Sequence, residues 1–411
     1  MAGASIDHMI SITIFLAAIL LFISLFNQTI QTAIIYQRHR YLATKCSDVL
    51  DNILLNPGYP LNPPWGKTNS TPTSFGLQDP EFTQYRLSPF SLMRLRSSTG
   101  TPITYPPNGL TYSNITMGFG NFLLVPYTLA VNYSTAAVLL GLNNTYGFQL
   151  TITPIITVSI TETQAANPLI LDVEVIGTGF PLSNATISWC FLKIDEKGSQ
   201  SSPSYSSFFG TTYTDEDGSA SLTVDNVEAD DSYVLIAYAH ISGLTGIGYH
   251  ERVTGDKRYV IPFIDSFEDR RVLLAHSYDI HYQGPPESAV FYNATFVMLT
   301  EDFTLREMPM ENATGKLGKI VYGHGTEKTY QNLTIPTYNP GILIITYQSN
   351  NEYGFVLMPW GISSMAFTVV FGDPPQNKEW VATDIRQVLV NGIAYQAKLS
   401  LWSLEGSSVV S

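Results

Sequence analysis

Charged residues are scarce in this sequence. Only 13% of its 411 residues are Asp, Glu, Lys or Arg, and the acidic residues outnumber the basic ones by 34 to 21. Proteins that bind nucleic acid need clustered Lys and Arg to neutralise phosphates, so a chain of formal net charge -13 is not expected to have a nucleic-acid partner. At about 150 residues per folded unit, the length predicts two or three such units.

Cysteine is almost absent, since Cys46 and Cys190 are the only two in the chain. They do not form a C-x-x-C pair, which excludes the usual zinc-binding and thioredoxin-like motifs. Cys46 falls in a predicted helix and Cys190 in a predicted strand. We interpret both as small buried apolar groups.

Local catalytic and cofactor motifs are missing too. The sequence has no phosphate-binding loop, G-x-G-x-x-G, H-E-x-x-H or G-x-S-x-G, and its seven histidines are scattered without metal-ligand spacing. We interpret Gly323-His324-Gly325-Thr326 as a polar turn. The prediction is a protein that is not an enzyme, with no catalytic residues and no cofactor. A site built from distant residues stays open as an alternative, because catalytic groups are defined by geometry and not by order.

Calcium is the one ion that the sequence suggests. Asp215 and Asp217 lie in the acidic turn 214–218, and Asp230 and Asp231 lie in a second acidic segment. If the two segments converge at one end of a sandwich, their carboxylates are weak candidates for calcium ligands. Turn chemistry, in which acidic side chains bond nearby backbone N–H groups, explains the same residues without an ion.

One long apolar run stands out. Residues 9–26 contain no charge, Gly or Pro, and 18 residues are enough to cross a bilayer as a helix. A cleaved secretory peptide normally ends in a small-x-small site, which Asn27-Gln28-Thr29 does not provide. Apolar residues continue at helical spacing until Asn56-Pro57-Gly58. We predict one helix over 9–55, membrane-spanning in its first half and amphipathic in its second.

The residues ahead of this run carry a family resemblance. Ala2-Gly3-Ala4-Ser5-Ile6-Asp7-His8-Met9 resembles the start of archaeal type IV pilin-like proteins of the class III signal peptide type. In these proteins a basic residue, a small residue and a short polar stretch with an acidic residue precede the apolar helix. The resemblance extends over residues 1–155 through short segments in the same order, such as 54–60, 85–89 and 133–142.

The resemblance implies processing and assembly. A prepilin-type peptidase would cut between Ala2 and Gly3, and Asp7 would then pair with the new N-terminal amine of a neighbouring subunit, a contact that burial in lipid strengthens. The sequence departs from the family pattern because no Lys or Arg precedes Ala2. The implied assembly surface is Asp7 with apolar side chains of the helix, namely Met9, Ile12, Phe15, Leu16, Ile19 and Phe22.

Two signals disagree about which side the chain faces. Arg38, His39, Arg40 and Lys45 follow the run, and the positive-inside rule places them in the cytoplasm. Nine N-x-Ser/Thr sequons place the same part of the chain outside, where N-glycosylation occurs. We favour the outside, since an amphipathic helix can hold basic residues against neighbours or anionic headgroups. The sequons are at Asn27 and at eight predicted glycosylation sites: Asn69, Asn114, Asn132, Asn143, Asn184, Asn293, Asn312 and Asn332.

The rest of the chain predicts mainly antiparallel β-structure with turns at short intervals. After a leader-like segment over 1–8 and the helix, we expect a small mixed domain over 56–152, an Ig-like β-sandwich over 153–255 and a second β-rich sandwich over 256–411. The small domain should hold a short helix near 133–142, capped by Ser134.

Two motifs support the Ig-like prediction. The order G-x-P-L-x-N-A-T at 179–186 and T-D-E-D-G-x-A-x-L at 214–222 resembles Ig-like repeats of surface adhesins and the regulatory-type sandwich of carboxypeptidases. A final hairpin over 388–401 should turn at Asn391-Gly392.

The sequence therefore predicts an extracellular structural or adhesive protein, a filament subunit in a minor or tip position. Its partners would be membrane lipid, a prepilin-type peptidase, and other pilin-like subunits or copies of itself bound through the N-terminal helix. The alternative is a monomeric single-pass binding protein or hydrolase, in which aromatics such as Trp360 and Trp380 line a sugar site. Buried core positions are the competing interpretation of both tryptophans.

Overall fold

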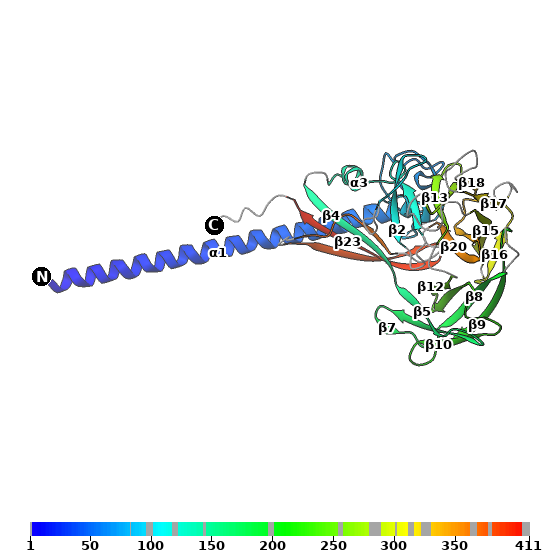
Figure 1. Ribbon diagram of the computed structural model, residues 1–411. Helices are drawn as coiled ribbons and strands as arrows, with labels where there is room; N and C mark the ends of the chain where they lie inside the picture. The colour runs from blue at the N-terminus through cyan, green and yellow to red at the C-terminus, as the bar shows by residue number, and fades with distance from the viewer. Residues whose placement is uncertain are drawn as a thin grey trace.

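A computed structural model of the chain shows one long helix attached to a β-rich head (Figure 1). The structure describes residues 2–82, 84–95, 102–116, 122–142, 145–195, 201–253, 258–278, 289–300, 302–310, 316–321, 330–361, 368–376 and 380–404. The expected fold class, a long N-terminal helix followed by mainly antiparallel β-structure, is confirmed.

Helix α1 (Ala2–Leu55) is continuous over 54 residues. It starts ahead of the expected position 9, so the segment predicted as leader-like is helical from Ala2 onward. It ends where predicted, because Pro57 has no backbone N–H to donate and Gly58 adopts a φ of 72°. Asn56 Oδ1 accepts a 2.9 Å hydrogen bond from the Gly58 N–H and fixes this turn.

Among the described residues, the head contains three short helices: η1 (Trp65–Lys67), α2 (Pro89–Met93) and α3 (Tyr133–Leu139). The last is the predicted short helix, but its cap differs from the expectation. Asn132 Oδ1 accepts from the Thr135 N–H at 2.8 Å, whereas Ser134 lies inside the helix. Asn132 has the extended backbone that a capping residue needs, with φ -84° and ψ 162°.

An eight-stranded sheet occupies the region predicted as the Ig-like sandwich. Its strands run in the order β10-β6-β5-β12-β11-β8-β9, with β7 paired to β6. Neighbours are antiparallel except β12 and β5. The sheet curls around its own apolar core until its two edge strands, β9 and β10, touch. The strands are β5 (Ile156–Gln164), β6 (Leu169–Gly177), β7 (Phe180–Pro181), β8 (Thr186–Asp195), β9 (Ser204–Tyr213), β10 (Ser219–Val224), β11 (Tyr233–Ile241) and β12 (Leu244–Arg252).

A five-stranded sheet packs on the outer face of β8 and β11. Cys190 and Leu192 point away from the curled core and are buried in the larger core shared with this sheet. Thr346 Oγ1 donates to Pro203 O at 2.7 Å across the contact. The regions predicted as two independent sandwiches are therefore joined by a buried interface. The strands are β15 (Val290–Leu299), β16 (Leu305–Met308), β17 (Leu317–Ile320), β19 (Gly341–Ser349) and β20 (Glu352–Trp360).

Two further sheets combine strands from the early and the late parts of the head sequence. In the six-stranded sheet, β3 pairs in parallel with β13, and in the four-stranded sheet β4 pairs with β23. Residues 56–152 are thus not a separate small domain, because their strands complete sheets made by 256–411. The strands are β1 (Ile103–Tyr105), β2 (Leu110–Thr116), β3 (Phe122–Pro126), β13 (Val260–Ser266), β14 (Arg271–His276) and β18 (Tyr330–Thr334), with β4 (Tyr146–Pro154), β21 (Val369–Phe371), β22 (Ala382–Val390) and β23 (Ile393–Ser403).

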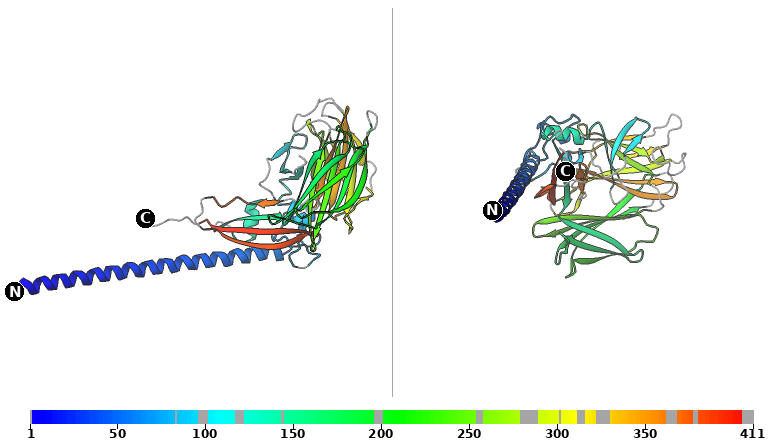
Figure 2. Two further views of the ribbon diagram at one scale, coloured as in Figure 1. Left: turned by 90° about the horizontal axis from the view of Figure 1, so that it is seen from below. Right: turned by 90° about the vertical axis from the view of Figure 1, so that its left-hand side faces the viewer.

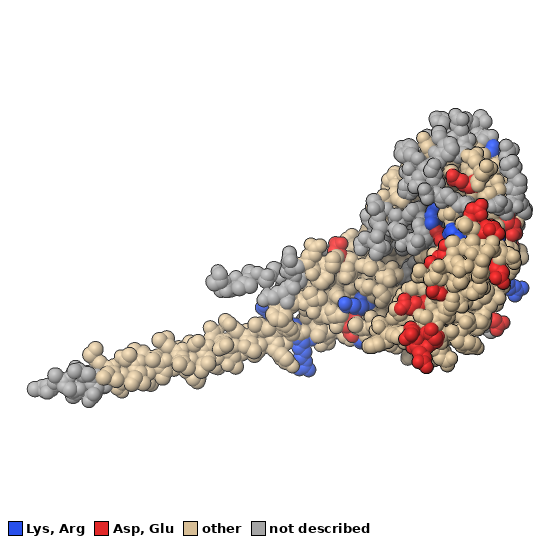
Figure 3. Space-filling model, turned by 60° about the horizontal axis from the view of Figure 1, so that its bottom comes forward, with Lys and Arg blue, Asp and Glu red and all other residues tan. Residues whose placement is uncertain are grey.

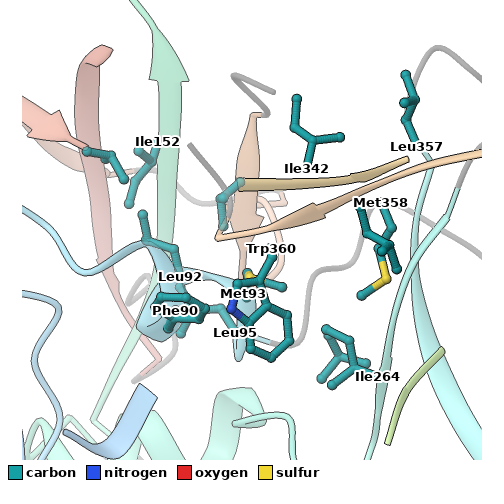
Figure 4. Close-up of a cluster of buried hydrophobic side chains, with 14 of the residues drawn as sticks. Phe90, Leu92, Met93, Leu95, Ile152, Ile264, Ile342, Leu357, Met358 and Trp360 are labelled. Carbon is teal, nitrogen blue, oxygen red and sulfur yellow. The ribbon is translucent and has the colours of Figure 1, made fainter. Parts of the chain in front are cut away.

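One apolar core connects these parts. It takes side chains from α1, α2 and all four sheets, and Figure 4 shows the region around Trp360, whose ring centroid lies 5.4 Å from that of Phe90. The labelled neighbours come from elements far apart in the sequence: Leu92, Met93, Leu95, Ile152, Ile264, Ile342, Leu357 and Met358. The head is therefore a single folded body and not a chain of modules.

Candidate functional site

The N-terminal part of α1, through residue 38, projects from the head (Figure 1) and carries more than half of the exposed large hydrophobic side chains of the described chain. Every side chain over 8–38 is exposed, and the helix is long and apolar enough to cross a membrane. The predicted assembly residues that are described lie here with 38–69% of their surface exposed: Met9, Ile12, Phe15, Leu16, Ile19 and Phe22. The side chains of Ala2, Gly3 and Asp7 lie outside the described residues.

The polar side chains of this helix are partly satisfied within it. Thr13 Oγ1 donates to the Met9 carbonyl at 2.8 Å, and Thr29 Oγ1 donates to the Leu25 carbonyl at 2.8 Å. A hydroxyl that bonds the preceding turn does not need water. These threonines are therefore compatible with an apolar environment, where an unsatisfied polar group is costly.

The second half of α1 docks on the four-stranded sheet, which lies along the helix in Figure 2. Cys46, Leu50 and Ile53 are fully buried in the core, and the Cys46 thiol donates to the Leu399 carbonyl at 3.5 Å. Burial raises the pKa of Cys46 to about 11, so the thiol remains protonated near neutral pH. The interpretation of both cysteines as buried is confirmed, because Cys190 is also free and buried.

A cluster of polar contacts, which we call the clasp, connects α1 to β22 at the edge of this docked surface. Arg386 on β22 lies 3.3 Å from the Asp51 carboxylate and donates to Ser47 Oγ at 3.0 Å. It also donates to the neighbouring Asp384 carboxylate at 2.5 Å. The partners on α1 are more than 330 positions away in the sequence. Sequence reasoning missed the clasp, since no local pattern links residues so far apart.

The docked part of the helix begins at His39. This residue lies two turns before Cys46 on the same helix face, and its ring centroid is 3.8 Å from that of Trp380, in the loop before β22. Trp380 itself remains 48% exposed. Trp360, its predicted companion in a sugar site, is fully buried beside Phe90, so the two tryptophans do not share a surface.

The five described sequons within the head differ in exposure. Asn132, Asn184 and Asn332 are exposed, while Asn69 and Asn293 are half-buried. The amide nitrogen of Asn69, the atom that would carry a glycan, donates to Ser266 Oγ at 2.9 Å. The side chain of Asn114 and all of Asn143 and Asn312 lie outside the described residues, as does His324.

The calcium candidates do not converge. Asp215 Oδ1 accepts from the backbone N–H groups of Asp217 and Ser219 at the start of β10. Asp231 pairs with Lys193 at 2.5 Å, in the loop that follows β10. The six residues of β10 separate the two segments by about 20 Å. Turn hydrogen bonds therefore explain the first segment, and the described part of the chain has no group of three or more His, Cys, Asp or Glu that could hold a metal.

A cleft of about 270 Å³ lies between the eight-stranded and five-stranded sheets. Its walls are mixed in character. Lys316 and Glu307 form a 2.8 Å ion pair on one side, and Tyr205 and Phe209 provide aromatic rings on the other. Asn293 faces the cleft and its Oδ1 is buried without a hydrogen-bond partner. Such a volume and lining suit a small polar molecule.

Comparisons with known proteins give little guidance. No protein-family profile and no curated protein sequence matches the chain. Among solved structures, the crystal structure of red sea bream transglutaminase is similar with a TM-score of 0.17 and 9% identity, over 61% of this chain and 37% of that chain. The match thus spans well under half the length of the transglutaminase, and a likeness at this TM-score indicates neither a shared fold nor a shared activity.

Proposed function

We propose that this chain is an extracytoplasmic surface protein that is anchored and assembled through α1, as a type IV pilin-like subunit without enzymatic activity. The observation that carries the proposal is the exposed apolar segment 9–26, attached to a folded head. Removing apolar surface from water contributes about 25 cal/mol per Å², on the order of tens of kcal/mol for such a helix. The segment therefore needs lipid or other helices around it.

In this proposal, α1 lies first in lipid and then among the helices of other subunits. The helix first resides in the bilayer, and cleavage between Ala2 and Gly3 then leaves an amine that Asp7 of a neighbouring subunit can pair with. Packing against copies of itself or other pilin-like subunits buries Phe15, Phe22 and their apolar neighbours. The head, with its exposed sequons, remains outside as a minor or tip component with a structural or adhesive role.

Anchoring is tested by alkaline extraction of membranes from cells that make the full chain. Leu16→Arg places a charge in the middle of the apolar run, at a cost of about 3 kcal/mol for insertion, and should raise the fraction released. Leu317→Arg is the matched control, because Leu317 is similarly exposed at 54% but lies on the head. Release of the unaltered chain by alkali would refute anchoring.

Assembly is tested by shearing cells, collecting filaments and reading the N-terminal residue of the chain within them. Gly3 at the N-terminus, with the chain present in filaments seen by electron microscopy, is the expected result. Asp7→Asn should leave membrane anchoring intact and reduce the amount in filaments. A chain that retains Met1 and stays in membranes as a monomer contradicts the assembly role while leaving the anchor.

The cleft between the two sheets supports the second candidate, an anchored monomer that binds a small polar solute. Calorimetry with N-acetylglucosamine and with glucose tests this role in the detergent-solubilised full chain. Glu307→Gln, which removes one charge from the cleft, should weaken any binding that occurs there. Heat that is unchanged in this variant argues against the cleft as the site.

A further inference from the structure

Aromatic and basic side chains surround α1 where it meets the head. Tyr36, Arg38, Arg40 and Tyr41 are exposed, and Arg38 and Arg40 lie on opposite flanks because successive residues are about 100° apart. Lys45 follows one turn later, and Trp380 adds a half-exposed ring held against His39. We call this set, Tyr36, Arg38, Arg40, Tyr41, Lys45 and Trp380, the collar.

The collar differs in charge from the rest of the molecule. Positions 8–47 contain no Asp or Glu and include the three basic residues of the collar, although the chain as a whole has a net charge of -13. Figure 3 shows Lys and Arg where the helix leaves the head, whereas most Asp and Glu on that face lie farther out on the head. On this face, basic side chains therefore gather where α1 leaves the head.

Helix length places the collar at a defined depth. The segment 9–35, between His8 and Tyr36, extends about 40 Å along the axis at 1.5 Å per residue. A bilayer including its headgroups is about 40–45 Å thick. If the segment is centred in a bilayer, Tyr36 and Arg38 lie at its surface, and the side chains of a helix lean toward its N-terminus, here toward the lipid.

We propose that the collar docks on anionic phospholipid headgroups of the leaflet that faces the head; this inference rests on the anchoring proposed above. Arg and Lys bind lipid phosphates, and Trp and Tyr favour the membrane interface. Because Trp380 belongs to the head and contacts His39, docking fixes the orientation of the head as well as the depth of the helix. A second copy of the chain is a poorer occupant, since it presents the same positive ring at the same height.

The full chain in lipid nanodiscs provides the test, with Trp380 as the probe. Of the other four tryptophans, Trp65 and Trp360 are fully buried, Trp402 is 5% exposed and Trp189 is half-buried. Subtracting the signal of Trp380→Phe therefore isolates Trp380. We expect acrylamide to quench Trp380 at least about twofold less in phosphatidylglycerol than in phosphatidylcholine discs, since each basic residue near an anionic surface contributes about a fivefold preference. Salt at 1 M, with a Debye length of about 3 Å, should remove the difference.

Charge variants separate docking from anchoring. Arg38→Gln/Arg40→Gln should raise quenching in phosphatidylglycerol to the phosphatidylcholine level, whereas Arg306→Gln/Lys319→Gln, a matched loss of two exposed charges on the five-stranded sheet, should not. Equal quenching in both lipids overturns the inference. The inference is also overturned if the protection of Trp380 from acrylamide depends on the amount of protein per disc and not on lipid charge. That result would indicate that a second copy of the chain covers the collar. In either case, a chain that stays in the membrane after alkaline extraction still supports the proposed anchoring. A chain that alkali releases contradicts the proposed function and not only the docking of the collar.

Discussion

His240 lies at the end of β11 in a contact that disfavours its charged form. Its ring centroid is 3.5 Å from that of Phe303, and its Nδ1 shares a 3.2 Å hydrogen bond with Thr245 Oγ1. Burial lowers the pKa of His240 from 6.5 to about 4. Between these two values the imidazole is neutral in the folded chain and protonated in the unfolded chain.

The unfolding free energy should therefore fall as the pH falls from 6.5 to 4, because the unfolded chain binds the extra proton. His240 is half-exposed, so we expect its share to be on the order of 1–2 kcal/mol, below what the full pKa shift implies. Urea midpoints of the detergent-solubilised chain at pH 7 and pH 4.5 should differ less in His240→Gln than in the unaltered chain. The same pH effect in both proteins would contradict this assignment.

The sequence was informative about some single residues and not about others. Cys46 and Cys190 were predicted to be buried, since small apolar groups in regular patterns belong to cores, and both are. Trp360 and Trp380 offered no such pattern. One is buried and the other half-exposed, because contacts with α2 and with His39 decide the outcome, and those contacts arise only in the folded chain.

At the scale of elements, local signals were reliable. The Asn391-Gly392 turn predicted a hairpin, and β22 and β23 pair around it. The end of α1 followed from Asn56-Pro57-Gly58 in the same way. Pairings between distant segments, such as β3 with β13 and β4 with β23, carry no local signal. The predicted domain boundaries did not anticipate these pairings, since each boundary assumed that neighbouring strands in sequence complete their own sheet.

The cap of α3 allows a prediction at this scale, because Asn132 is both the capping residue and an exposed sequon. Asn132→Ala removes the cap and any glycan and should cost about 1 kcal/mol of unfolding free energy. Asn132→Ser removes the glycan alone, since serine caps as well as asparagine. Thermal unfolding of both variants separates the two effects. If Ser and Ala destabilise equally, the glycan and not the cap is responsible.

At the scale of the whole molecule, one shared apolar core connects the sheets of the head. The outer face of the eight-stranded sheet presents Cys190, Val234 and Ile236 to the five-stranded sheet, all buried. Ser232 Oγ adds a 3.1 Å hydrogen bond to the Tyr353 carbonyl across the same contact. The sequence of β8 predicted a strand. It did not show that both faces of the strand are buried, because the same residues would also fit a strand in an isolated sandwich.

A fragment of residues 153–255 should therefore not behave as an independent domain. Its exposed outer face should bind the dye ANS and promote association, as exposed apolar surface does. The full chain, in contrast, should unfold in a single calorimetric transition for the head. A soluble, monomeric fragment with a sharp transition of its own would show that the interface contributes little.

The contact between α1 and β23 determines when, during synthesis of the chain, the apolar face of α1 can be buried. The Cys46 thiol meets the Leu399 carbonyl across 353 positions, and ribosomes add about 5–20 residues per second. The apolar face of the helix thus waits about 20–70 s after its own synthesis for the strand that covers it. A nascent chain stalled before residue 393 would leave that face exposed to chaperones and proteases. A truncation near the C-terminus should therefore lead to recognition and degradation of the chain through its N-terminal helix.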